Sequence, residues 1–183
     1  MEPQWGDWRQ LRLATVPAGV QAWLSDQGSL TRRVVQACGA GGFRVRLLRQ
    51  GWARPRYSEG RVLRLRRGGV ALLREVELLC DGRPWVFART LIPAASLQGS
   101  ARRLTQLGER PLGAVLFSDP AIRRGLTQVA RLLPRHPLFQ AACAHLQAPP
   151  AELWGRRTLF YVDGQPLLVN EIFLPDIPRG PAP

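Results

Sequence analysis

The fold is decided by two segments built on one plan: Cys80-Asp81-Gly82-Arg83-Pro84-Trp85-Val86-Phe87-Ala88-Arg89-Thr90-Leu91-Ile92-Pro93 and Val162-Asp163-Gly164-Gln165-Pro166-Leu167-Leu168-Val169-Asn170-Glu171-Ile172-Phe173-Leu174-Pro175. In each segment an Asp-Gly pair stands between two apolar runs, and the closing proline lies at the same distance from that pair. Asp-Gly favours a β-hairpin because the turn needs positive φ, which these residues adopt at little cost. The sequence therefore predicts two similar hairpins, far apart along the chain.

Each hairpin carries a charged residue among the apolar residues of its second strand. Arg89 and Glu171 occupy equivalent positions counted from Asp-Gly, and Arg74 is a third charge, on the predicted strand 70–80. Because side chains two residues apart share a face of a strand, each charge is expected on an otherwise apolar face. Such a charge is costly unless it is paired or binds a ligand. The pattern leaves two interpretations open: a buried Arg–Glu pair that closes the sheet, or a pocket that holds carboxylates with guanidinium groups.

Composition favours one globular domain. The chain has 183 residues, 45% of them hydrophobic, and we assign residues 1–175 to a single domain and residues 176–183 to a proline-rich flexible tail. No apolar run is long enough for a membrane span, and no secretory signal is visible at the N-terminus. The three cysteines have no metal-ligand spacing, so structural zinc and a disulfide framework are not expected, and a reducing cytoplasm fits best.

The net charge of +13 comes entirely from arginine, because the 26 basic residues include no lysine. These arginines are scattered among abundant Ala, Gly and Pro, which indicates codon bias more than phosphate recognition. Specific nucleic-acid binding is therefore not expected, although the positive field attracts anions in general. A small anionic substrate would benefit from the same field.

The remaining signals predict an α+β domain with an antiparallel sheet of about six strands and helices packed on one face. Helices are expected at 17–27 and 29–38, a polar loop at 53–60 and strand-like alternation at 43–47 and 61–65. Residues 94–148 are helical in pattern. In particular, Asp119-Pro120 resembles a helix start, and Ile122, Leu126, Val129 and Leu133 are spaced for one buried helical stripe.

Several kinds of chemistry have little support in the sequence. The only histidines, His136 and His145, lack a cysteine or carboxylate at metal-ligand spacing, so no metal site is expected. No phosphate-binding loop or dinucleotide fingerprint is present. Cys80 and Cys143 are interpreted as core residues because no basic partner is evident. Arg74, Arg89 and Glu171 remain as the candidate site.

At this point the sequence resembles the chorismate pyruvate-lyase family over most of its length. The motifs that carry the resemblance are Leu73-Arg74-Glu75-Val76, Cys80-Asp81-Gly82-Arg83-Pro84-Trp85, Ala88-Arg89-Thr90, Leu107-Gly108-Glu109-Arg110-Pro111-Leu112-Gly113, Leu153-Trp154-Gly155-Arg156-Arg157 and Asn170-Glu171-Ile172-Phe173-Leu174-Pro175. Gly28-Ser29-Leu30-Thr31 matches more weakly, with Leu30 where methionine is familiar, and residues 133–151 look like an insertion.

The resemblance implies helical flaps over a buried site and a cofactor-free elimination of pyruvate from chorismate, which gives 4-hydroxybenzoate for ubiquinone biosynthesis. By position, Arg74 would hold a carboxylate together with the main-chain amides of Leu30 and Leu112, and Glu171 would face the opposite, polar end of the ring. Arg89 matches a second family arginine, which would line the path or hold the other carboxylate. The catalytic residues are thus expected to be Glu171, Arg74 and Arg89. No metal or other cofactor is expected, and the protein is expected to act as a monomer in the cytoplasm. The alternative is a non-catalytic sensor domain of the same fold that binds a small carboxylate.

Overall fold

The centre of the computed structural model is an antiparallel sheet. The model describes residues 1–183 apart from 8–15, 40, 120–121 and 179–183. In the described residues the sheet has seven strands, in the order β1-β5-β6-β7-β4-β3-β2. The strands are β1 (Gly6–Asp7), β2 (Phe43–Ala53), β3 (Ala71–Cys80), β4 (Arg83–Pro93), β5 (Arg123–Leu132), β6 (Leu153–Val162) and β7 (Gln165–Phe173). The helices are α1 (Ala18–Ser25), α2 (Leu30–Cys38), α3 (Tyr57–Val62), η3 (Ala94–Ser96), η4 (Gly99–Gln106), α4 (Leu112–Leu116) and α5 (Pro137–Cys143), of which η3 and η4 are 3₁₀ helices.

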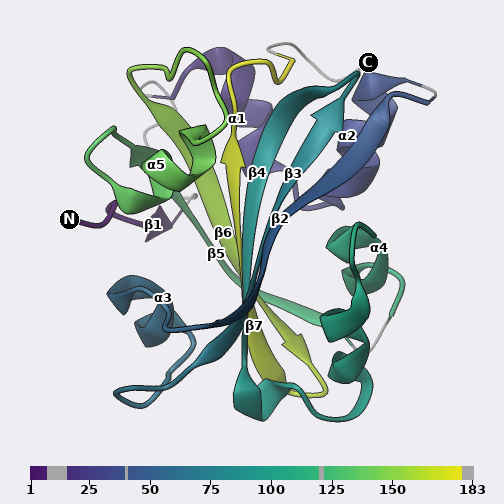
Figure 1. Cartoon of the computed structure of the whole chain (residues 1–183), viewed down its shortest axis with the longest axis vertical. Coiled ribbons are helices and arrows are strands. Elements are labelled where there is room, and N and C mark those ends of the chain that lie inside the picture. Colours follow the sequence, from purple (N-terminus) through teal and green to yellow (C-terminus); the bar gives the residue numbers. More distant parts are fainter. Residues whose placement is uncertain (8–15, 40, 120–121, 179–183) are drawn as a thin grey trace.

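Both predicted hairpins are confirmed. Asp81 and Gly82 have φ of 49° and 78°, and Asp163 and Gly164 have φ of 50° and 77°, as this two-residue turn requires. The hairpins β3–β4 and β6–β7 are joined in one sheet because β4 pairs with β7. Figure 1 shows how strongly this sheet twists, so that its strands cross near the middle of the molecule.

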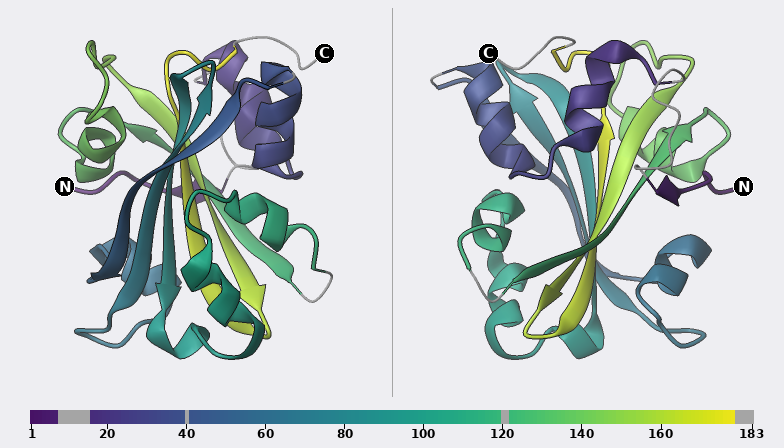
Figure 2. Two further views of the ribbon diagram at one scale, coloured as in Figure 1. Left: turned by 45° about the vertical axis from the view of Figure 1, so that its right-hand side comes forward. Right: turned by 180° about the vertical axis from the view of Figure 1, so that it is seen from behind.

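Helices cover both faces of the sheet, whereas the sequence predicted them on one. We call the face that carries Val76 and Val169 the pocket face. On this face α1 and α2 lie over one end of the strands, and η4 and α4 lie over the other end (Figures 1 and 2). On the opposite face, which we call the far face, α5 packs through Phe139 against Phe87, and α3 lies further along the sheet.

Three elements differ from the predicted ones. The strand expected at 61–65 is not formed, because Arg61 and Val62 end α3 and residues 63–64 form the turn that follows it. The loop expected at 53–60 contains α3, and a capping contact starts it: Glu59 accepts a hydrogen bond of 2.8 Å from the Arg56 amide. The helix expected at 122–133 is instead strand β5, paired with β6. Leu126, which the helical stripe would have buried, is 49% exposed where the pairing of β5 shifts register.

A β-bulge in β4 decides which way its side chains point. Leu79 pairs with Pro84 and Leu78 with Val86, so β4 holds one extra residue at Trp85. The second hairpin has no such insertion along Val162–Phe173. A shift of one residue moves every later side chain to the other face of the sheet. From the bulge onward, the two hairpins therefore differ in orientation at positions that are equivalent in sequence.

The prediction that the cysteines form no disulfide was wrong. Cys38 at the end of α2 is bonded to Cys80 at the end of β3. The two residues are 42 positions apart, and only the packing of α2 on the sheet brings them together. Cys143 is a buried free thiol, as expected of a core residue, and burial raises its pKa to about 11.

The first part of the predicted tail packs against α1. Ile177 is buried, and Trp23 Nε1 donates a hydrogen bond of 2.9 Å to the Pro178 carbonyl. Residues 179–183 lie outside the described residues. No helix in the described part of the chain is both long enough and apolar enough to cross a bilayer.

Candidate ligand-binding pocket

A pocket lies on the pocket face between the sheet, the start of α2 and the start of α4. It has an empty volume of about 510 Å³, part of it open to solvent. Its walls are mostly apolar and carry few charged groups, an arrangement typical of sites for small organic ligands. The lining residues are Leu30, Thr31, Val45, Arg74, Val76, Leu78, Ala88, Thr90, Pro111, Leu112, Gly113, Leu116, Phe117, Phe160, Val169 and Glu171.

Arg74 is the buried cation of this pocket. It lies on β3, opposite Thr90, and is 4% exposed. Its Nη2 donates to the carbonyls of Gly108 and Arg110, at 2.8 and 3.0 Å, in the segment that leads into α4. Its Nε is buried and has no hydrogen-bond partner among the described residues. Burial lowers the pKa of Arg74, because it removes water from around the charged guanidinium.

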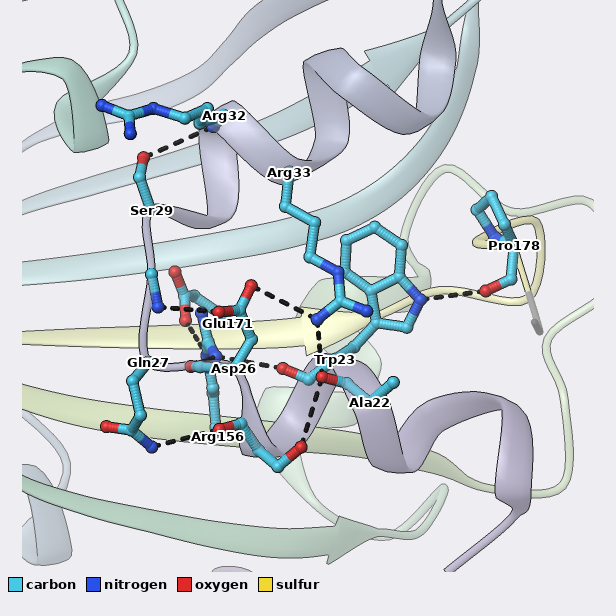
Figure 3. A network of polar contacts seen from close by, with 12 residues as sticks. Ala22, Trp23, Asp26, Gln27, Ser29, Arg32, Arg33, Arg156, Glu171 and Pro178 are labelled. Carbon is cyan, nitrogen blue, oxygen red and sulfur yellow. Dashed lines mark hydrogen bonds and ion pairs between the residues drawn. The ribbon is translucent and has the colours of Figure 1, made fainter. Parts of the chain in front are cut away.

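Glu171 is the carboxylate of the same pocket and is held by Arg156. Arg156 Nε donates to Glu171 Oε2 at 2.5 Å, and Arg156 is 1% exposed. The rest of the Arg156 guanidinium binds the end of α1, since Nη1 donates to the Trp23 carbonyl at 3.0 Å and to the Asp26 carbonyl. Figure 3 shows this network, in which Arg33 pairs with Asp26 at 3.3 Å.

The sequence did not reveal the role of Arg156, although it belongs to a motif that carried the family resemblance. On strand β6 it alternates onto the face shared by Thr158 and Phe160, and its register partner is Glu171. The strand alternation was readable from the sequence. The pairing of this arginine with that glutamate follows from the hairpin register counted back from the Asp163-Gly164 turn.

Two helix starts border the pocket, at Leu30 and at Leu112. Ser29 caps α2, as predicted, by accepting a hydrogen bond of 3.3 Å from the Arg32 amide. Amides in the first turn of a helix have no acceptor within that helix and are ready to bind an anion. The two helices approach closely at Gly113. A Cβ added there would lie 2.7 Å from Thr31 Oγ1, which is too close for a side chain.

The structure does not bring Arg89 to the pocket. Because of the bulge in β4, Ala88 pairs with Glu171 on the pocket face and Arg89 points to the far face. There Arg89 donates to Glu59 at 2.8 and 3.2 Å and to Glu75 at 2.6 Å. Its pKa is raised, because its hydrogen bonds and ion pairs with these carboxylates outweigh its burial. Arg89 thus fits the structural interpretation of a buried ion pair, with partners other than Glu171.

Neither histidine lies in the pocket. His136 is buried, and its Nδ1 accepts a hydrogen bond of 3.0 Å from the Leu133 amide. Burial and the neighbouring Arg135 lower its pKa. His145 Nδ1 lies 3.3 Å from Glu77 Oε1, away from the pocket lining.

One group of possible metal ligands comes together within the described ranges, formed by Cys38, Cys80 and Asp81. The disulfide joins the two sulfur atoms, so neither is available as a thiolate ligand.

Comparison with known proteins gives a family match over nearly the whole chain. The model of the family described as "Chorismate lyase" matches residues 3–179. A protein of Nitrosomonas europaea named "Probable chorismate pyruvate-lyase" is 43% identical over 165 residues, covering 90% of this chain and 92% of the relative. A protein of the same name from Halorhodospira halophila is 43% identical and covers 98% of this chain and 95% of the relative.

Solved structures share the fold at low sequence identity. The ligand-binding domain of a putative GntR-family transcriptional regulator from Bordetella bronchiseptica aligns with a TM-score of 0.53 and 19% identity, over 76% of this chain and 88% of that one. A GntR-family regulator from Bacillus cereus aligns with a TM-score of 0.55 and 11% identity, over 74% and 94%. At such identities the likeness concerns the fold alone.

Proposed function

We propose that this chain, which belongs to the chorismate lyase family, acts as a chorismate pyruvate-lyase and that its pocket binds chorismate. The reaction would release pyruvate and leave 4-hydroxybenzoate, which makes the protein a carbon–oxygen lyase. One observation above all supports the proposal: Arg74 and Glu171 line one largely apolar pocket, together with two helix starts.

The pocket offers a different environment to each end of the chorismate ring. Arg74 would bind the ring carboxylate with its guanidinium, and the main-chain amides of Leu30 and Leu112 would complete that site. Glu171 would accept a hydrogen bond from the ring hydroxyl at the opposite end. The apolar wall formed by Val76, Val169 and others would pack against the ring.

In the reaction, the bond between the ring carbon and the ether oxygen breaks, and its electron pair leaves with the enolpyruvyl group. The ring loses the hydrogen of the hydroxyl-bearing carbon, and the enolpyruvyl carbon gains a proton, so that pyruvate and an aromatic ring result. Aromatisation supplies the driving force, and we propose that no cofactor is needed. The protein has to orient the dianion and stabilise charge on the departing oxygen, which are effects of positioning and electrostatics.

The helices over the pocket imply slow release of the product. Thr31 of α2 and Gly113 of α4 lie close together at the pocket, so these two elements narrow the path by which a ligand leaves. Steps of this kind limit turnover in many enzymes with lids. We therefore expect 4-hydroxybenzoate to inhibit the reaction at low concentration.

Incubation of the purified protein with chorismate, without metal or nucleotide, tests the function. The expected result is equimolar pyruvate and 4-hydroxybenzoate, resolved by chromatography from 3-hydroxybenzoate. Binding of 4-hydroxybenzoate without turnover would favour the sensor interpretation, for which the shared fold with GntR-family domains is the only support. Arg74→Gln and Glu171→Gln should reduce turnover, and Arg103→Gln, in an exposed ion pair with Asp119, should not.

We also propose a monomeric protein in the cytoplasm. Because the cytoplasm is a reducing compartment, the proposal implies that Cys38 and Cys80, which are bonded in this structure, are kept there as thiols. Cells lysed in the presence of an alkylating agent, followed by mass spectrometry, would show whether these cysteines are reduced in situ. Light scattering after size exclusion measures the mass, which is 20.4 kDa for one chain.

A further inference from the structure

Arg74, Arg124 and Arg156 are three arginines that lie in or beside the pocket, together with the carboxylate of Glu171. Arg156 and Glu171 neutralise each other in their ion pair of 2.5 Å. Arg74 and Arg124 have no carboxylate within ion-pair distance in the described part of the chain. Asp26 is paired with Arg33. Of the three arginines, Arg74 and Arg124 are therefore the two that no ion pair in the described residues neutralises.

Arg124 lies against Phe160, a residue of the pocket wall. On β5 it is the register partner of Phe160, a lining residue, and its guanidinium carbon is 5.9 Å from the centre of that ring. One end of the guanidinium donates to the Gln27 carbonyl, in the linker between α1 and α2, and the other lies 3.5 Å from Thr158 Oγ1. Strand β6 and the linker between α1 and α2 thus hold Arg124 in place.

Arg124 resembles Arg74 in its hydrogen bonding. Its Nε, like that of Arg74, is buried without a hydrogen-bond partner among the described residues. Arg33 shares this feature, but its guanidinium is already paired with Asp26. Burial and the nearby Arg156 lower the pKa of Arg124, while Glu171 and Asp26 oppose this shift, so all three of these charged groups lie near its guanidinium. Buried donors without an acceptor are rare and costly, so a ligand oxygen would stabilise this arginine.

We propose that Arg124 binds the enolpyruvyl carboxylate of chorismate. The inference rests on the proposed function, under which the substrate carries two carboxylates. With the ring carboxylate at Arg74 and the hydroxyl at Glu171, the ether oxygen is on the carbon adjacent to the hydroxyl-bearing one. The enolpyruvyl group then extends along the wall beside Glu171, where Arg124 lies. Arg74 and Arg124 together match the two negative charges of the substrate, a role for which the sequence suggested Arg89.

The difference between substrate and product gives the test, because 4-hydroxybenzoate has lost the second carboxylate. Arg124→Gln should lower kcat/KM for chorismate about 10- to 100-fold, the usual effect of losing a hydrogen bond to a charged group. The same variant should keep its Kd for 4-hydroxybenzoate within about twofold. Arg74→Gln should weaken both. Arg123→Gln is the matched control, because Arg123 is exposed on the same strand and stacks on Tyr161 instead.

Two results would overturn the assignment: an unchanged kcat/KM for chorismate, or an equal loss for chorismate and product, which indicates a structural role. If Arg124→Gln does not fold by circular dichroism, Arg124→Lys decides the question, because it keeps the charge and removes the planar fork. The kcat/KM of Arg124→Lys for chorismate should lie between that of the wild type and the value expected for Arg124→Gln, and its Kd for 4-hydroxybenzoate should be unchanged. Wild-type protein that is inert toward chorismate would refute the proposed function itself, before any variant is measured.

Discussion

Replacement of Arg156 should destabilise the protein more than any exposed arginine does. Arg156 joins Glu171 of β7 to the carbonyls of Trp23 and Asp26 at the end of α1, and it is 1% exposed. In Arg156→Met the volume is largely kept, while a carboxylate and two carbonyls lose their donor. Breaking a buried ion pair by removing one partner costs about 3–5 kcal/mol. Because the Glu171 side chain is 16% exposed and can partly rehydrate, we expect the lower end, about 3 kcal/mol.

Urea unfolding, followed by tryptophan fluorescence, measures this loss. With a slope of about 2 kcal/mol per molar urea, the midpoint should fall by roughly 1.5 M. Arg131→Met is the control, because Arg131 and Glu152 form an ion pair whose side chains are 57% and 30% exposed. Pairs exposed to this degree contribute about 0–1 kcal/mol, so its midpoint should hardly move.

A double variant separates the ion pair from the other contacts of Arg156. Arg156→Met combined with Glu171→Met removes the unpaired carboxylate, and replacing both partners by apolar side chains is often neutral. The double variant should therefore be more stable than the sum of the two single changes by at least about 1 kcal/mol. Additive losses, or a single-variant loss no larger than that of Arg131→Met, would refute the reasoning.

Three further predictions address the far face, the flaps and the buried thiol. Arg89→Gln should lower the urea midpoint yet leave the Kd for 4-hydroxybenzoate within about twofold, since Arg89 pairs on the far face; lost product binding in a folded variant would contradict this. Gly113→Ala should weaken product binding in a fluorescence titration by forcing α4 away from Thr31, whereas Gly51→Ala, with nothing within 4 Å of the added Cβ, should not. The pKa of Cys143 is raised from 9.0 to about 11, so its contribution to stability is complete below pH 9 and is lost as the pH rises from 9 to 11. Cys143→Ala should remove this part of the pH dependence in unfolding experiments, and an unchanged slope would show that the thiol is not responsible.

Local signals predicted the hairpins and α2 correctly because each depends on a few adjacent residues. Asp-Gly supplies positive φ in both turns, and Ser29 supplies the cap of α2. The family resemblance extends this to the site, since Arg74 and Glu171 line the pocket that their motifs implied. Their roles toward a ligand remain predictions.

Elements that depend on distant partners were not readable from local pattern. Residues 122–133 have helical spacing but become β5, because β6 offers a strand with which to pair. The disulfide joins Cys38 and Cys80 across 42 positions of the chain. In both cases the deciding contact joins two segments that are distant in sequence. The spacing of apolar residues within one segment does not indicate that it will contact the other.

The position of Arg89 on the far face has a single physical cause. Counted from Asp-Gly, Arg89 and Glu171 are both eighth after the aspartate, and equal counts predict equal faces on strands without irregularities. The extra residue at Trp85 reverses the face from that point on. The amino-acid composition of the strand does not distinguish a bulge of this kind from a regular strand. The face on which Arg89 lies could therefore not be predicted from the sequence.

The buried arginines on the two faces of the sheet differ in their partners, and this difference indicates which face binds a ligand. Both faces of the sheet bury arginine, so burial of a charge is not in itself a sign of function. On the far face, Glu59 and Glu75 supply Arg89 with carboxylates, and the ion pair needs nothing further. On the pocket face, Arg74 and Arg124 each keep a buried donor without an acceptor and have no carboxylate within ion-pair distance in the described ranges. Because burying such cations is costly, a face that retains them is explained by a ligand that supplies the missing acceptors. The balance between donors and acceptors on each face, more than the presence of charge, identifies the site.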